Sequence, residues 1–77
     1  PVFTTENGIK RIKEYIGDLK NWSELSNLIP SQYSSSKLKK SGYAGILAGA
    51  LELTREGNIS IKQNKLYDEI FIKENNE

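Results

Sequence analysis

The 77-residue chain contains no cysteine, no histidine and no methionine. Without cysteine it can form neither a disulfide nor a thiolate zinc site, a composition compatible with a reducing compartment. Without histidine as well, it lacks the commonest catalytic bases, nucleophiles and transition-metal ligands. No catalytic constellation or phosphate-binding loop can be assembled from the remaining residues. We therefore predict a protein that is not an enzyme, with no cofactor, metal or small-molecule ligand.

The sequence also lacks a long apolar run. Its least polar stretch, SGYAGILAGALEL (41–53), contains a G-x-x-x-G motif from Gly45 to Gly49. The uncharged part is about half of the roughly 20 residues that a membrane-spanning helix needs, and Glu52 ends it. A G-x-x-x-G motif marks a transmembrane dimer only inside such a long segment. We expect a buried helix and no membrane partner.

Strong charge of one sign is absent too, since 11 basic and 10 acidic residues give a net charge of +1. No strongly charged partner is implied. The length indicates a single domain over residues 1–77, and we expect its ends, 1–5 and 74–77, to be frayed. Because the chain starts at Pro1 without a signal peptide, we expect a piece of a longer protein or a processed one.

Two helices are predicted in the first thirty residues. Thr4 or Thr5 can cap the first helix, and Gly17 weakens its end. Its apolar face recurs at helical spacing, at Ile9, Ile12, Ile16 and Leu19.

The second predicted helix is short. Asn21 and Glu24 have the spacing of a capping box, and Pro30 ends the helix after about two turns. Its apolar face consists of Trp22, Leu25, Leu28 and Ile29.

A third, longer helix is predicted over residues 37–56, with Ser36 as its cap and Gly57 as its stop. The apolar period then changes from 3.6 to 2, which indicates a β-hairpin. Asn64 and Lys65 would form its turn. Ile59 and Ile61 would face the core together with Ile70 and Ile72, and Tyr67 and Phe71 would lie on the other face. Three helices followed by a β-hairpin outline an α+β winged helix; the alternative is an unrelated α+β mini-domain.

The third predicted helix has three kinds of surface. A core stripe consists of Leu38, Tyr43, Ile46, Ala50 and Leu53. Another side carries Gly42, Gly45 and Gly49, each about 0.8–1 kcal/mol less favourable than alanine in a helix. That cost predicts close packing of another backbone, most simply the first or second helix. The whole apolar arc is about twice as wide as one core requires. The excess, at Ala44, Leu47 and Leu51, is either a second edge of the core or a partner surface.

Nucleic-acid binding is a competing hypothesis, because winged helices often place their third helix in the major groove. The middle of this helix has no Arg, Asn or Gln to read a base edge. Weak phosphate contacts remain open at Lys37, Lys39, Lys40 and Lys62. A third hypothesis is an unrelated module that associates with itself.

The stretch ALELTREGNISIKQNKLYDEIFI (50–72) resembles the C-terminal segment of ScpA, the bacterial kleisin called segregation and condensation protein A. The shared pattern is Leu51-Glu52-Leu53, Gly57, the strand 59–63 ending in Gln63, Tyr67, and Ile70-Phe71-Ile72. Upstream, NWSELSNLIP and KLKKSGYAGILAGALEL are similar to the family's second and third helices, so the likeness covers about residues 8–73. The chain departs from the family at Leu47, Gly49, Tyr67 and 68–69.

The resemblance implies a C-terminal winged-helix domain that docks on the ATPase head of an SMC protein in a condensin-like complex. Such a domain would act as an adaptor in chromosome condensation, segregation and cell division, in the cytoplasm at the nucleoid. ScpB would bind a part of the kleisin outside this chain, and DNA contact would be indirect or weak. The implied head-contacting residues are Ala44, Leu47, Leu51, Ile61, Gln63 and Phe71.

Overall fold

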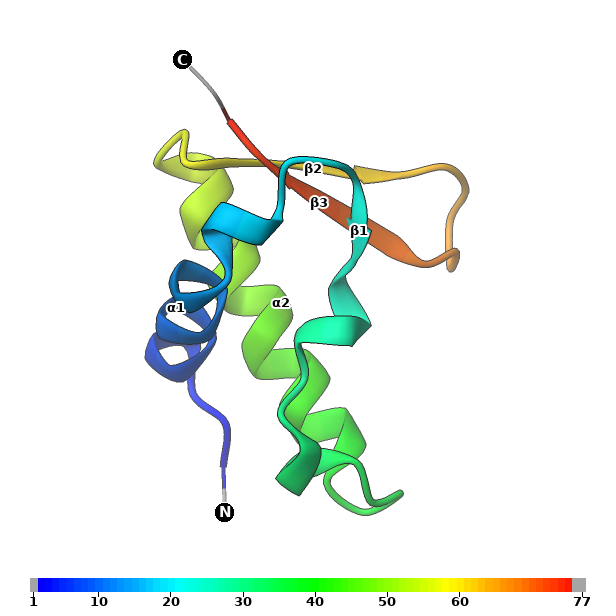
Figure 1. Ribbon diagram of the computed structural model, residues 1–77. Coiled ribbons are helices and arrows are strands. Elements are labelled where there is room, and N and C mark those ends of the chain that lie inside the picture. The colour runs from blue at the N-terminus through cyan, green and yellow to red at the C-terminus, as the bar shows by residue number, and fades with distance from the viewer. Residues whose placement is uncertain (1, 76–77) are drawn as a thin grey trace.

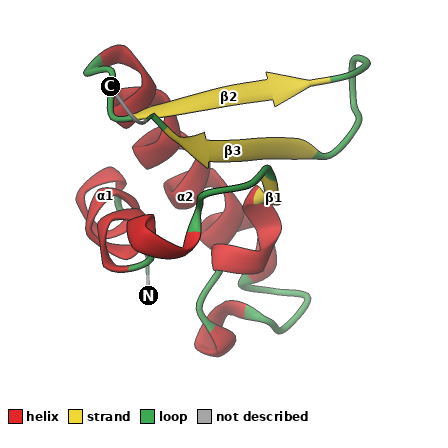
Figure 2. Ribbon diagram, turned by 45° about the horizontal axis from the view of Figure 1, so that its top comes forward, coloured by secondary structure: helices red, strands yellow, loops and turns green. Residues whose placement is uncertain are grey.

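The computed structural model describes residues 2–75, which form two α-helices and a three-stranded antiparallel sheet (Figure 1). The predicted α+β class is confirmed. The elements run in the order α1 (Thr5–Glu14), β1 (Ser23–Glu24), α2 (Lys39–Arg55), β2 (Ile59–Gln63) and β3 (Ile70–Glu74). Short 3₁₀ helices at Ile16–Asp18, Leu25–Leu28 and Ser31–Tyr33 complete the connections. Figure 2 shows the helices gathered beside the β2–β3 hairpin, which extends away from them.

Helix α1 begins where the sequence predicts. The Asn7 N–H donates to Thr4 Oγ1 (3.1 Å), and the Thr4 N–H donates to Asn7 Oδ1 (3.0 Å). This reciprocal pair satisfies two backbone donors at the helix start. The helix ends earlier than its apolar period suggests, at Glu14, and a 3₁₀ turn follows. The apolar face is nevertheless right, with Ile12 and Leu19 buried and Ile9 and Ile16 half-buried.

The predicted second α-helix is wrong. Residues 23–24 instead form β1, which pairs with β3, and a 3₁₀ helix Leu25–Leu28 follows. Pro30 allows only this short turn, because the residue before a proline is biased towards extended geometry and Ile29 adopts it (φ −67°, ψ 125°). The buried pair Leu25 and Leu28 is three residues apart, a spacing that suits a 3₁₀ helix as well as an α-helix.

Helix α2 matches the predicted third helix except at its start. It begins at Lys39 with no side-chain cap, so the predicted Ser36 cap is wrong; Ser35 O accepts from the Lys39 N–H instead (2.9 Å). Its end is as predicted. Gly57 has φ 84°, and the Asn58 N–H donates to Leu53 O (2.9 Å), the pairing of a Schellman motif.

The predicted hairpin is confirmed, with β3 at the centre of the sheet order β1-β3-β2. Ile61 is opposite Ile72 in the β2–β3 register. The alternation predicted Tyr67 on the same strand face as Phe71, and this prediction is wrong. Tyr67 lies in the loop 64–69 with φ 72° and is 93% exposed. The loop is longer than a two-residue turn at Asn64 and Lys65 would be.

Both ends of the described range contact the rest of the fold; fraying over 1–5 and 74–77 stays a prediction. Phe3 is buried, with its ring 5.1 Å from that of Tyr33. At the other end, the Glu74 N–H donates to Leu19 O (2.7 Å) and the Asn75 N–H to Asn58 O (3.1 Å). Residues 1, 76 and 77 lie outside the described residues.

The core lies between α1, α2 and the inner face of the sheet. Its largest fully buried side chains are Ile12, Leu25, Ile46, Leu53, Ile59 and Ile72. Of the predicted core stripe of α2, Ile46, Ala50 and Leu53 are buried, and Leu38 and Tyr43 pack against the core from its edge.

Helix α1 approaches α2 backbone to backbone, as the glycines of α2 predict. A Cβ added to Gly49 would lie 2.6 Å from the carbonyl carbon of Gly8, and one added to Gly45 would overlap the carbonyl oxygen of Phe3. Gly42 contacts a side chain instead of α1, since a Cβ there would lie 2.9 Å from the Tyr33 Cβ. Gly8, which the sequence analysis did not single out, supplies the complementary gap in α1: a Cβ there would overlap Gly45 O.

The glycine contact yields a stability prediction. Gly49→Ala should lower the free energy of unfolding by about 1–3 kcal/mol or more, because the methyl group forces two backbones apart. The matched control is Gly17→Ala, where nothing lies within 4 Å of the added Cβ and φ is not positive. That variant should be as stable as the wild type or slightly more stable. Urea unfolding followed by circular dichroism measures both; equal stability of the two variants would contradict the tight contact.

Candidate docking surface

The side of α2 opposite its glycines is only partly covered. Ala44 is exposed, Leu47 is half-buried against the core, and Leu51 is 53% exposed. Leu47 therefore belongs to the edge of the core and to the surface, whereas Leu51 belongs to the surface. Large apolar side chains exposed next to one another mark interaction sites more often than single ones do.

Between α2 and the hairpin there is a surface depression to which both leucines contribute. The predicted residues Leu47, Leu51, Ile61 and Gln63 line it together with Lys62 and Ile70. The structure thus brings together four of the six side chains that the family resemblance implies. Gln63 also has a local role, because its Nε2 donates to Asp68 O (2.7 Å) and holds the hairpin loop.

A second, larger depression of about 770 Å³ continues from Leu47 towards the start of α2. Its apolar lining includes Ala44, a fifth predicted residue. Because Leu47 lines both depressions, we treat them as one continuous surface and call it the α2 groove. The residues of the second depression are Ser26, Ile29, Ser36, Lys39, Lys40, Tyr43, Ala44, Leu47 and Glu69.

The polar end of the α2 groove contains the Glu69 carboxylate and the Tyr43 phenol. The Ser26 hydroxyl donates to the Glu69 carboxylate (2.8 Å), which ties the hairpin loop to the 3₁₀ helix after β1. Burial raises the pKa of the Tyr43 phenol, and the nearby Glu69 carboxylate raises it further. Tyr43 therefore stays protonated at neutral pH and can donate a hydrogen bond. The sequence pattern gave no sign of Glu69 here, since its place depends on how the loop folds back.

Phe71, the sixth predicted residue, does not join the groove. It alternates with Ile70 and Ile72, which are in the core or pack against it, so its side chain points to the outer face of the sheet. Trp22 is at this outer face too, rather than on the apolar face of a helix. The Nζ atoms of Lys62 and Lys73 lie 4.5 Å and 5.3 Å from its ring centroid.

The four lysines named for phosphate contacts lie in two separate places, three near the start of α2 and one on β2. Lys37, Lys39 and Lys40 are exposed at the start of α2, and the last two line the groove. Lys62 lines the groove at its other end, beside Leu51, and its ammonium group lies over the Trp22 ring. These four cations do not form one continuous phosphate-binding stripe.

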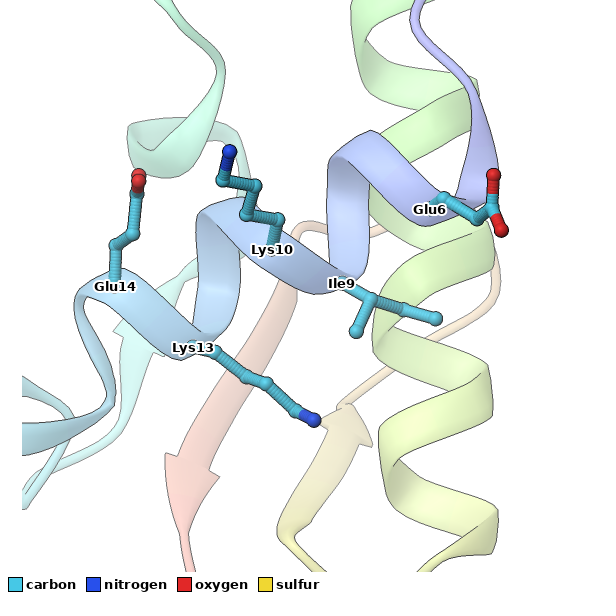
Figure 3. Close-up of a pocket in the computed structure, with 5 residues that line it drawn as sticks. All are labelled: Glu6, Ile9, Lys10, Lys13 and Glu14. Carbon is cyan, nitrogen blue, oxygen red and sulfur yellow. The ribbon is translucent and has the colours of Figure 1, made fainter.

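A further depression lies along α1 and is lined by Glu6, Ile9, Lys10, Lys13 and Glu14. Figure 3 shows its charged side chains pointing outward from the helix without converging on one point. Within residues 2–75 no group of three or more potential ligands could hold a metal ion. No helix in the same range is long and apolar enough to cross a membrane.

No protein family, curated protein or solved structure matches the chain. The case for a function therefore depends on the α2 groove and on the sequence resemblance.

The environment of Tyr43 predicts how stability depends on alkaline pH. Because its pKa is raised in the folded state, the unfolded chain loses the phenolic proton first as pH passes about 10. The free energy of unfolding should therefore fall more steeply above pH 10 in the wild type than in Tyr43→Phe. Urea unfolding at several pH values measures this difference. Glu69→Gln should keep most of the steep fall, because burial raises the Tyr43 pKa more than the Glu69 charge does. Identical stability profiles of the wild type and Tyr43→Phe would contradict a raised Tyr43 pKa in the folded state.

Proposed function

We propose that the chain is a winged-helix domain of an ScpA-like kleisin, and that its α2 groove docks on the ATPase head of an SMC protein. In this role it is a non-enzymatic adaptor that serves chromosome condensation and segregation at the nucleoid in the cytoplasm. ScpB would bind a different part of the kleisin. The sequence resemblance names the partner, and the geometry of the groove is consistent with protein docking.

The order of the elements supports the winged-helix assignment. A short strand between α1 and α2 pairs with β3, and the β2–β3 hairpin directly follows α2 as a wing would. The chain differs from the expected pattern in one element, because 3₁₀ turns replace the second helix. Those turns still bury Leu25, Leu28 and Tyr33, so they fill the position of that helix in the core.

The exposed Leu51 is the observation that carries the docking proposal. It lies in the groove beside Leu47 and Ile61, which are already half-buried. A partner that covers Leu51 would complete the burial of all three. Apolar area removed from water contributes roughly 25 cal/mol per Å², which favours a protein partner over the phosphates of DNA at this site.

Titration calorimetry with the purified SMC ATPase head from the same genome tests the proposal. The wild-type chain should form a stoichiometric complex, and Leu51→Lys should abolish it or weaken it by at least about tenfold, equivalent to 1.4 kcal/mol. Because Leu51 is exposed, the circular dichroism spectrum should not change.

Val2→Lys is the matched control, since Val2 is 75% exposed and does not line the groove. It should bind the head as the wild type does. A short DNA duplex is titrated in parallel. Binding to the duplex that weakens steeply with salt, with no binding to the head, would overturn the proposal in favour of a nucleic-acid-binding domain.

A further inference from the structure

The charges of this chain are separated along the sequence. All ten acidic residues lie in 1–24 and 52–77, and the segment between them carries only three charged residues, Lys37, Lys39 and Lys40. That segment supplies the 3₁₀ turns and most of α2. The cations of this segment therefore lie together, just before and at the start of α2.

The structure places two of these cations on the α2 groove. Lys39 and Lys40 line its polar end, beyond Ala44 and Leu47. The ion pair found among the described residues joins Arg55 and Glu52 and involves neither lysine. Glu69 is the one carboxylate lining the same depression, and it accepts a hydrogen bond from Ser26.

Along α2 the groove thus has an apolar part at Leu47 and Leu51 and a cationic end at Lys39 and Lys40. Lys62 lines the apolar part from β2, with its ammonium group over the Trp22 ring. The twelve residue steps from Lys39 to Leu51 correspond to about 18 Å at 1.5 Å per residue. One partner helix of about three to four turns is long enough to contact both ends. Charges placed at one end of an apolar contact fix the direction and register of the partner more than they add affinity.

We propose that the partner surface in the α2 groove is an apolar ridge that carries carboxylates at one end, and that these face Lys39 and Lys40. This inference depends on the proposed docking function of the groove and specifies the chemistry of the partner. Protein carboxylates fit better than nucleic-acid phosphates, because a phosphate backbone has no apolar surface to cover Leu47 and Leu51.

The test is the charge-reversal variant Lys39→Glu/Lys40→Glu, compared with Lys10→Glu/Lys13→Glu on α1. Both variants change the net charge by the same amount, and all four lysines are exposed, but Lys10 and Lys13 lie outside the α2 groove. Calorimetry with the SMC head should show binding weakened at least about tenfold by the first variant and less than about twofold by the second. Raising the salt concentration should weaken the wild-type complex more than that of the first variant.

The outcomes separate the two proposals. If Leu51→Lys abolishes binding while Lys39→Glu/Lys40→Glu binds like the wild type, the groove docks the head but the acidic ridge is wrong. If both charge reversals weaken binding equally, net charge and not the groove is responsible, and the inference is again overturned. If the wild-type chain does not bind the head, the proposed function itself fails, and this inference fails with it.

Discussion

The structure depends on one contact, the crossing of α1 and α2 at Gly8, Gly45 and Gly49. No side chain separates the two backbones there, and a single methyl group at Gly49 would lie 2.6 Å from a backbone atom. The contact brings Ile12 of α1 and Ile46 of α2 into the same buried core. The conformational cost of Gly45 and Gly49 in α2 is offset by the close packing against α1 that they permit.

Because α1 covers the glycine side of α2, the opposite side of the same helix is left for the hairpin and, in the proposed role, for a partner. The hairpin covers only part of it. Ile59 and Ile72 are fully buried, whereas Ile61 and Ile70 cover Leu47 incompletely and leave Leu51 exposed. The α2 groove is thus a consequence of a wide apolar arc meeting a narrow sheet. The packing of α1 on the glycine side determines where the groove lies. Its apolar and cationic character comes from the side chains of α2 that the core leaves uncovered, Leu51 and the lysines at the start of the helix.

Much of this arrangement could be predicted from the sequence, where local signals were strong. The Thr4 cap, the Gly57 stop, the long helix and the alternating hairpin all have short-range physical causes. The cost of three glycines in one helix also predicted a close backbone contact, although it did not identify Gly8 as the partner. Four of the six residues singled out on α2 and the hairpin line one depression, because helical and strand periods determine which side chains share a face. The prediction failed where tertiary pairing decided the outcome. Ser23 and Glu24 are extended because they pair with β3, almost fifty residues away in the sequence. The placements of Glu69, Tyr67 and Phe71 likewise depend on how the hairpin loop closes and how the sheet is covered.

The environment of Trp22 has a spectroscopic consequence. This is the chain's single tryptophan, and it lies on the outer face of the sheet with the Lys62 and Lys73 ammonium groups over its ring. Its neighbours come from β2 and β3, and one of them, Lys62, also lines the α2 groove. Fluorescence excited at wavelengths that tryptophan absorbs and the four tyrosines do not therefore monitors the attachment of the segment before α2 to the sheet. Because Lys62 also lines the α2 groove, occupation of the groove reaches this emission only through that one side chain, whereas detachment of the segment from the sheet changes the whole surroundings of the ring.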